Sequence, residues 1–111
     1  MSLTYEDLHT AWKKVKHAVS TDKSKPNLQY IHIEHDDRVT KLIAMDGYRI
    51  SITEIRLSGL TGNFRADDPE IKRMFERWRF TDVDEDKFNA LSIPVEYPSV
   101  AGYDLEKYRA F

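Results

Sequence analysis

Three short runs of β-forming residues follow one another between Lys25 and Ile55, with a tight turn between each pair. The strongest turn signal is Asp46-Gly47, because glycine adopts a positive φ without strain and aspartate tolerates the left-handed region. Strands joined by turns this short pair as antiparallel neighbours. The segment therefore predicts a β-meander, and the remainder of the chain must fold around it.

The predicted strands span residues 28–34, 38–45 and 48 to about 55. In the first strand, Ile31 and Ile33 point to one face and more polar side chains point to the other. The second strand has apolar residues at consecutive positions, so both of its faces carry them, which indicates partial burial on both faces. In the third strand the alternation stops after Ile52 and the next apolar residue is Ile55, which predicts a bulge or the end of the strand.

An amphipathic helix is predicted before the strands. Thr4 can cap this helix, with Asp7 in the reciprocal capping position. The apolar residues that recur at helical spacing are Leu8, Ala11, Trp12, Val15, Ala18 and Val19. Projection at about 100° per residue places Lys13, Lys14 and His17 opposite this stripe, so the solvent face is basic. Such a face could follow the phosphates of a nucleic acid, or it could be an ordinary solvated lysine face.

The second half of the chain is less regular. Residues 58–63 form a predicted flexible link, after which Asp67 or Asp68 can cap a second helix with Pro69 at its first position. The apolar side of that helix is expected to carry Ile71, Met74, Phe75 and Trp78. The acidic run at 81–86 lacks the glycine and the distal glutamate of a calcium-binding loop, so it predicts a solvated turn that caps a short helix.

The composition limits the class of protein. The 111 residues suffice for one domain, which we expect to span residues 1–111. Charged residues make up 32% of the chain with a net charge of -2, so the overall charge gives no nucleic-acid signal. The chain has no cysteine, and no apolar run approaches the roughly 20 residues that a membrane span needs. We expect a cytoplasmic protein with no membrane partner.

No catalytic motif is present in the sequence. The chain has no cysteine nucleophile, no glycine-rich phosphate loop, no HExxH and no G-x-S-x-G. His32 and His35, together with Asp36 or Asp37, could form a site at one strand end, but exposed turn residues are the commoner explanation. We therefore predict no enzymatic activity, no catalytic residue, no metal site and no cofactor.

Two motifs resemble those of a known family. Residues 20–28 are S-T-D-K-S-K-P-N-L, and residues 44–50 are A-M-D-G-Y-R-I. With the preceding helix, they resemble the middle domain of the bacterial DNA polymerase III β subunit, the DNA sliding clamp, over about residues 8–55. The departures are Lys25, Met45 and Ile50, where the family usually has Arg, Thr and Leu.

The resemblance implies an α+β fold in which an amphipathic helix packs on an antiparallel β-meander. Residues 4–55 would form a DNA-clamp-like half-domain, and residues 56–111 would form a divergent part with one or two extra helices. In clamps this helix lines the central channel, which makes Lys13, Lys14 and His17 the candidate DNA-facing residues. They would contact the backbone of duplex DNA without reading its sequence.

Clamps also bind short peptide motifs of polymerases and other replication proteins in a hydrophobic pocket. The positions that match this pocket are Leu28, Met45, Gly47, Tyr48, Arg49 and Ile50. Met45 would reshape the pocket, because a long thioether replaces the small hydroxyl of the usual threonine. For the whole set, an ordinary role in the core, in the turn or in a cross-strand pair is the alternative.

Two functional hypotheses follow. The first is a sliding-clamp-like, non-catalytic protein that acts in DNA replication as a processivity factor and is encoded by a phage or another mobile element. The alternative is a small protein-interaction or regulatory module that keeps the clamp-like fold without encircling DNA. A lone half-domain exposes a sheet edge and a helix face, so we expect two chains to pair as a homodimer, unless the second predicted helix covers that surface within one chain.

Overall fold

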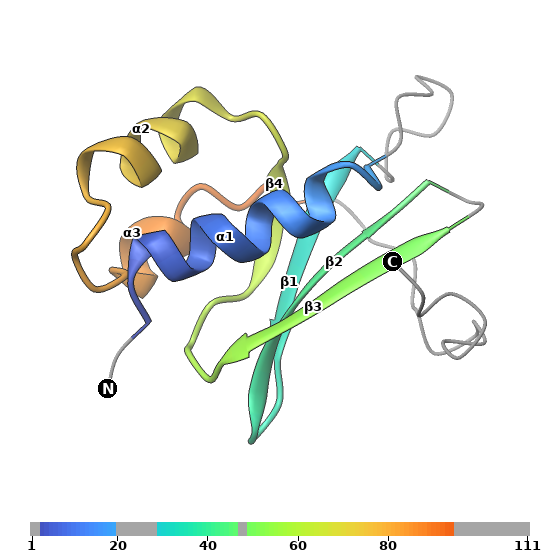
Figure 1. Ribbon diagram of the computed structural model, residues 1–111, viewed down its shortest axis with the longest axis horizontal. Helices are drawn as coiled ribbons and strands as arrows, with labels where there is room; N and C mark the ends of the chain where they lie inside the picture. The colour runs from blue at the N-terminus through green and yellow to red at the C-terminus, as the bar shows by residue number, and fades with distance from the viewer. Residues whose placement is uncertain (1–2, 20–28, 47–48, 95–111) are drawn as a thin grey trace.

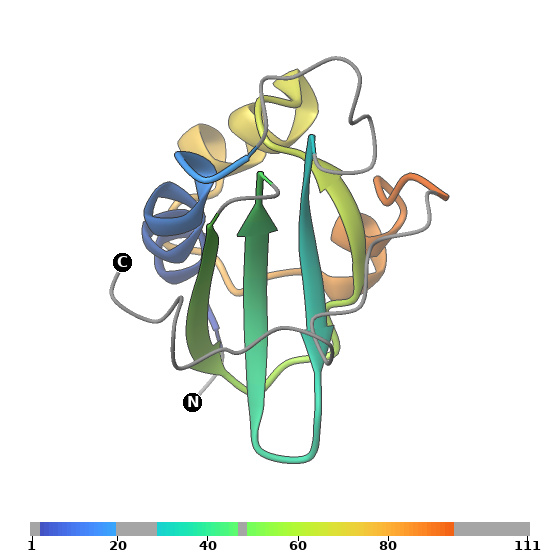
Figure 2. The same ribbon diagram turned by 90° about the vertical axis from the view of Figure 1, so that its right-hand side faces the viewer.

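The computed structural model describes residues 3–19, 29–46 and 49–94. The elements in chain order are α1 (Tyr5–Lys16), β1 (Tyr30–His35), β2 (Val39–Met45), β3 (Ile50–Arg56), β4 (Gly62–Arg65), α2 (Pro69–Arg77) and α3 (Glu85–Asn89). The four strands form one antiparallel sheet in the order β3-β2-β1-β4. The helices lie on one side of this sheet, with α2 beside α1 (Figure 1). In Figure 2, turned by 90°, the four strands lie side by side, with α1 to the left beside β3 and α2 above.

The predicted helix and meander are confirmed. The ladder between β2 and β3 runs without interruption from Val39 opposite Arg56 to Met45 opposite Ile50. The predicted bulge after Ile52 is therefore wrong. The spacing between apolar residues changes because β3 places isoleucines on both faces of the sheet. Ile55 packs against the core under α1, whereas Ile52 lies on the opposite face.

Both faces of β2 are buried, as its composition predicted. Leu42 and Ala44 belong to the core cluster under the helices. Ile43, Met45 and, opposite Met45, Ile50 of β3 lie on the other face, and their side chains are only 1%, 1% and 2% exposed. The sheet therefore has apolar packing on both sides at its β2–β3 end.

The fourth strand was not predicted. Residues 58–63 were expected to form a flexible link, but Gly62 opens β4 and pairs with Ile33 of β1. A four-residue strand that contains Gly and Asn has little intrinsic β-propensity. Two hydrogen bonds on the side of β4 away from β1 compensate for this low propensity. The Asn63 N–H donates to Ser92 Oγ at 3.1 Å, and the Ile93 N–H donates to the Asn63 carbonyl at 2.8 Å.

An aromatic cluster joins the helices to β4. The Trp12 ring of α1 makes edge contacts with Phe64, Phe75 and Phe88, at centroid distances of 6.3, 5.6 and 6.1 Å. Its indole Nε1–H donates to the carbonyl of Ala66 at 2.9 Å. These partners come from β4, α2 and α3, so Trp12 links α1 to all the elements that follow the meander.

The second predicted helix therefore covers surface within the chain. Asp68 caps α2, and Pro69 occupies its first turn, as predicted. Ile71 and Phe75 of α2 are buried, and α2 contacts α1. No helix in the described ranges has the length and apolar character that a membrane span requires.

Candidate nucleic-acid interface

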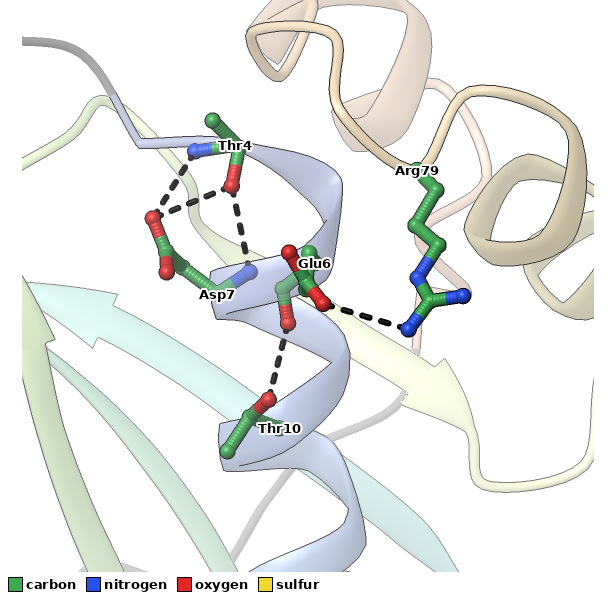
Figure 3. A network of polar contacts seen from close by, with 5 residues as sticks. All are labelled: Thr4, Glu6, Asp7, Thr10 and Arg79. Atoms are coloured by element: carbon green, nitrogen blue, oxygen red, sulfur yellow. Dashed lines mark hydrogen bonds and ion pairs between the residues drawn. The ribbon is translucent and has the colours of Figure 1, made fainter.

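The N-terminal end of α1 is closed by hydrogen bonds from two sources. The predicted capping box is present: the Asp7 N–H donates to Thr4 Oγ1 at 3.2 Å, and the Thr4 N–H donates to the Asp7 carboxylate at 3.4 Å (Figure 3). The next donors reach the α2–α3 connection, because the Tyr5 N–H donates to the Thr81 carbonyl and the Glu6 N–H donates to the Arg79 carbonyl. All the first backbone donors of α1 are thus satisfied, and its axis is fixed relative to this connection.

The solvent face of α1 is basic, as predicted. Lys13, Lys14 and His17 are exposed, whereas Trp12 and Val15 are buried beneath the helix. Lys16 is exposed as well. We call Lys13, Lys14, Lys16 and His17 the α1 basic face. The protein presents a local positive surface there although its net charge is -2.

Arg49 lies at the C-terminal end of this helix. Its Nη2 donates to the His17 carbonyl at 3.0 Å, and its Nε donates to Asp46 Oδ2 at 3.1 Å. A cation at a helix C-terminus is favourable, because the last carbonyls carry a partial negative charge. Arg49 therefore extends the α1 basic face at one end, although its partnership with Asp46 offsets part of its charge.

Arg79 extends the same surface near the other end. Its guanidinium pairs with Glu6 at 3.3 Å (Figure 3). The His9 ring stacks on Phe75 with the two centroids 4.6 Å apart. Burial lowers the pKa of His9, and the charges of Lys13, Arg79 and Lys16 lower it further. Lys13, Lys16 and Arg79 are therefore all close enough to His9, between α1 and α2, to lower its pKa.

The lowered pKa of His9 predicts a pH dependence of stability. The neutral form is favoured in the folded state, so stability is fully present above the ordinary pKa of 6.5 and is lost as the pH falls from there through the folded-state value. His9→Phe keeps a ring against Phe75 and removes the titration. We expect the urea midpoint to fall between pH 7.5 and 5.5 by more in the wild type than in this variant. Equal pH dependence in the two proteins would contradict this prediction.

The structure separates the described members of the predicted peptide pocket. Met45 and Ile50 face each other across β2 and β3 and are both buried on the sheet face away from α1. The Arg49 side chain instead reaches the end of α1. Leu28, Gly47 and Tyr48, the other predicted pocket residues, lie outside the described residues. Sequence reasoning missed the link from Arg49 to His17, because no local pattern brings a helix end to a hairpin.

The histidines of β1 have separate partners. His32 Nδ1 lies 2.8 Å from Asn63 Oδ1, and His35 Nδ1 lies 3.0 Å from the Leu60 carbonyl. The Asp36 carboxylate accepts the backbone N–H groups of Arg38 and Val39, which lower its pKa. Across the described ranges, no group of His, Cys, Asp or Glu side chains could hold a metal ion.

The acidic run at 81–86 caps a short helix, as predicted. Asp84 is the N-cap of α3 and accepts the Lys87 N–H at 3.1 Å. The Glu85 carboxylate accepts the N–H of Gly59, in the connection between β3 and β4. Two of these carboxylates thus have structural partners.

Comparison with known proteins shows a likeness in fold. No known family model matches the chain, and no curated protein sequence matches it. The chain is similar to the solved structure of a DnaN sliding clamp (DNA polymerase III subunit beta) from Bartonella birtlesii bound to griselimycin, with 23% sequence identity and a TM-score of 0.50. The match covers 68% of this chain and 23% of that clamp. The clamp-like α+β architecture that the two sequence motifs implied is therefore confirmed.

Proposed function

We propose that this protein is a sliding-clamp-like, non-catalytic protein that associates with the backbone of duplex DNA in replication. The observation that carries the proposal is the α1 basic face, which lies on a helix packed against a clamp-like sheet. Lysine ammonium groups are point charges, so they would hold the phosphate backbone without reading bases. A local basic surface attracts DNA even on a chain whose net charge is -2.

Charge reversal on this face tests the proposal. We expect the double variant Lys13→Glu, Lys14→Glu to bind duplex DNA at least tenfold more weakly than the wild type at about 50 mM salt. The slope of log affinity against log salt should also become shallower, because fewer counterions are released. Fluorescence anisotropy with a labelled duplex measures both quantities. Lys72→Glu, which reverses an exposed lysine of α2, is the matched control and should have a smaller effect.

Failure of the wild type to bind duplex DNA at about 50 mM salt would refute the proposal. The alternative, a protein-interaction module with a clamp-like fold, would then be favoured. A partner peptide at the predicted pocket would have to reach Met45 and Ile50, both of which are buried. Peptide binding would therefore require these two side chains to become accessible, and the Met45 methyl signal in an NMR titration would report it.

Helix α2 covers the helix face within the chain, so among the described residues only the sheet edge remains for assembly, and we propose a homodimer through that edge. Within the described sheet, β3 pairs with β2 alone, whereas the outer side of β4 is bonded to Ser92 and Ile93. An antiparallel pair of two β3 strands centred on Ile55 would set Glu54 opposite the partner's Arg56, and the reverse. Light scattering that shows a monomer at high micromolar concentration would contradict this assembly.

A further inference from the structure

Two exposed aromatic side chains follow α2. Among the described residues, the exposed large hydrophobic side chains are Leu57, Trp78 and Phe80, with exposed fractions of 45%, 45% and 75%. Trp78 was expected on the apolar side of α2, and this prediction is wrong. The helix ends at Arg77, and Trp78 is its C-cap, with a non-helical φ of -112° and ψ of 25°. Trp78 and Phe80 alternate with two arginines in the run Arg77-Trp78-Arg79-Phe80, which we call the aromatic turn.

The backbone of the aromatic turn is held in place. The Trp78 N–H donates to the Met74 carbonyl at 3.0 Å, and the Thr81 N–H donates to the Trp78 carbonyl at 2.8 Å. The carbonyls of Arg79 and Thr81 accept the first N–H groups of α1, as described above. The two rings are therefore presented to solvent by an ordered backbone, which lowers the entropic cost of binding a ligand to them.

Cations accompany both rings. The Arg79 guanidinium carbon lies 5.2 Å from the centroid of the Phe80 ring, and Lys87 Nζ lies 5.7 Å from the centroid of the Trp78 ring. Exposed aromatic faces beside cations are the features that bind single-stranded nucleic acids, because unpaired bases stack on the rings and phosphates contact the cations. Bases within a duplex are already stacked on one another and cannot use such rings.

The aromatic turn lies against α1, whose C-terminal half carries the α1 basic face. The Arg79 carbonyl accepts the Glu6 N–H at 2.8 Å, and the Arg79 guanidinium pairs with the Glu6 carboxylate at 3.3 Å. The neighbouring acidic run carries four exposed carboxylates, which would repel phosphates: those of Asp82, Asp84, Glu85 and Asp86. Stacking on the rings is therefore expected to supply most of the binding at this end of the surface.

We propose that the aromatic turn binds unpaired bases of a single strand that continues from the duplex lying on the α1 basic face. The protein would thus prefer a junction between double-stranded and single-stranded DNA over a blunt duplex. This inference rests on the proposed function, because the duplex part of the ligand is held by the α1 basic face. Stacking of one base on one aromatic ring strengthens binding by roughly 5- to 150-fold.

The experiment compares a blunt duplex with the same duplex carrying a single-stranded dT overhang, at either the 5′ or the 3′ end. We expect the wild type to bind one of the overhang ligands at least tenfold more tightly than the blunt duplex. The double variant Trp78→Ala, Phe80→Ala should lose this preference and keep its affinity for the blunt duplex. Leu57→Ala, which removes the other exposed apolar side chain, is the control and should keep the preference.

A second readout uses the intrinsic fluorescence of the wild type. Trp78 is exposed and Trp12 is buried, so base stacking should quench the Trp78 emission when the overhang ligand is added. Equal wild-type affinity for blunt and overhang ligands, or a preference that survives in the Trp78→Ala, Phe80→Ala variant, would overturn the inference. If blunt-duplex binding still weakened with Lys13→Glu, Lys14→Glu, the proposed function would stand. Absence of binding to all these ligands would overturn both.

Discussion

Replacement of Trp12 by alanine is expected to lower the free energy of unfolding by roughly 3–5 kcal/mol. The Trp12 side chain is 3% exposed and contacts one phenylalanine from each of β4, α2 and α3. The substitution would leave a cavity among these rings, and the Ala66 carbonyl would lose its indole donor. Because Trp12 joins α1 to every element that follows the meander, the loss should affect the whole structure and not α1 alone.

Urea unfolding followed by far-UV circular dichroism measures this effect. Phe80→Ala is the matched control, since Phe80 is 75% exposed and its removal should change stability by less than about 0.5 kcal/mol. A loss of under about 1 kcal/mol in Trp12→Ala would mean that the aromatic cluster does not hold α1 to the rest of the chain.

The second large effect is expected on the opposite face of the sheet. Ile43→Ala should lower the free energy of unfolding by roughly 2–5 kcal/mol, as is usual for a fully buried isoleucine. Ile43 is 1% exposed although it points away from the helices. On a sheet with one solvated face, an outward-pointing residue would contribute far less.

Two neighbouring positions serve as comparisons for the effect of Ile43→Ala on stability. Leu42→Ala removes a residue of the helix-facing core and should be comparably destabilising. Ile52 lies opposite Ile43 on β3 and is only partly buried, so Ile52→Ala should have a smaller effect. If Ile43→Ala and Ile52→Ala had the same small effect in urea unfolding, the sheet face away from α1 would not be a packed surface.

The elements that the sequence predicted well are those determined by local interactions. In α1, the cap and the buried stripe depend on residues within the helix itself, and Thr4, Asp7 and Trp12 all take their expected places. The meander was predictable because alternation and short turns specify antiparallel neighbours. The basic character of the α1 solvent face followed from the same periodicity.

The features that were missed depend on contacts between distant residues. Strand β4 contains Gly62 and Asn63 and is held by Ser92 and Ile93, which no local pattern connects to it. Arg49, directly before β3, finds its carbonyl partner at His17, the C-cap of α1. The end of α2 was misplaced because helical periodicity alone continues through Trp78, whereas the chain turns there to meet the N-terminus of α1.

The contact between the N-terminus of α1 and the α2–α3 connection has a consequence for folding during translation. The Glu6–Arg79 pair spans 73 residues, and the Val83 N–H donates to the Leu3 carbonyl at 2.8 Å. The start of α1 leaves the ribosome long before these partners are synthesised. During translation, the first backbone N–H groups of α1 therefore lack their partners from residues 79 and 81. The N-terminus of α1 thus acquires its final geometry only after translation has passed residue 83, and an isolated fragment that ends before α2 lacks the groups that complete it. Contacts between residues this far apart in the chain form late, because the entropy of closing the intervening loop must be overcome first.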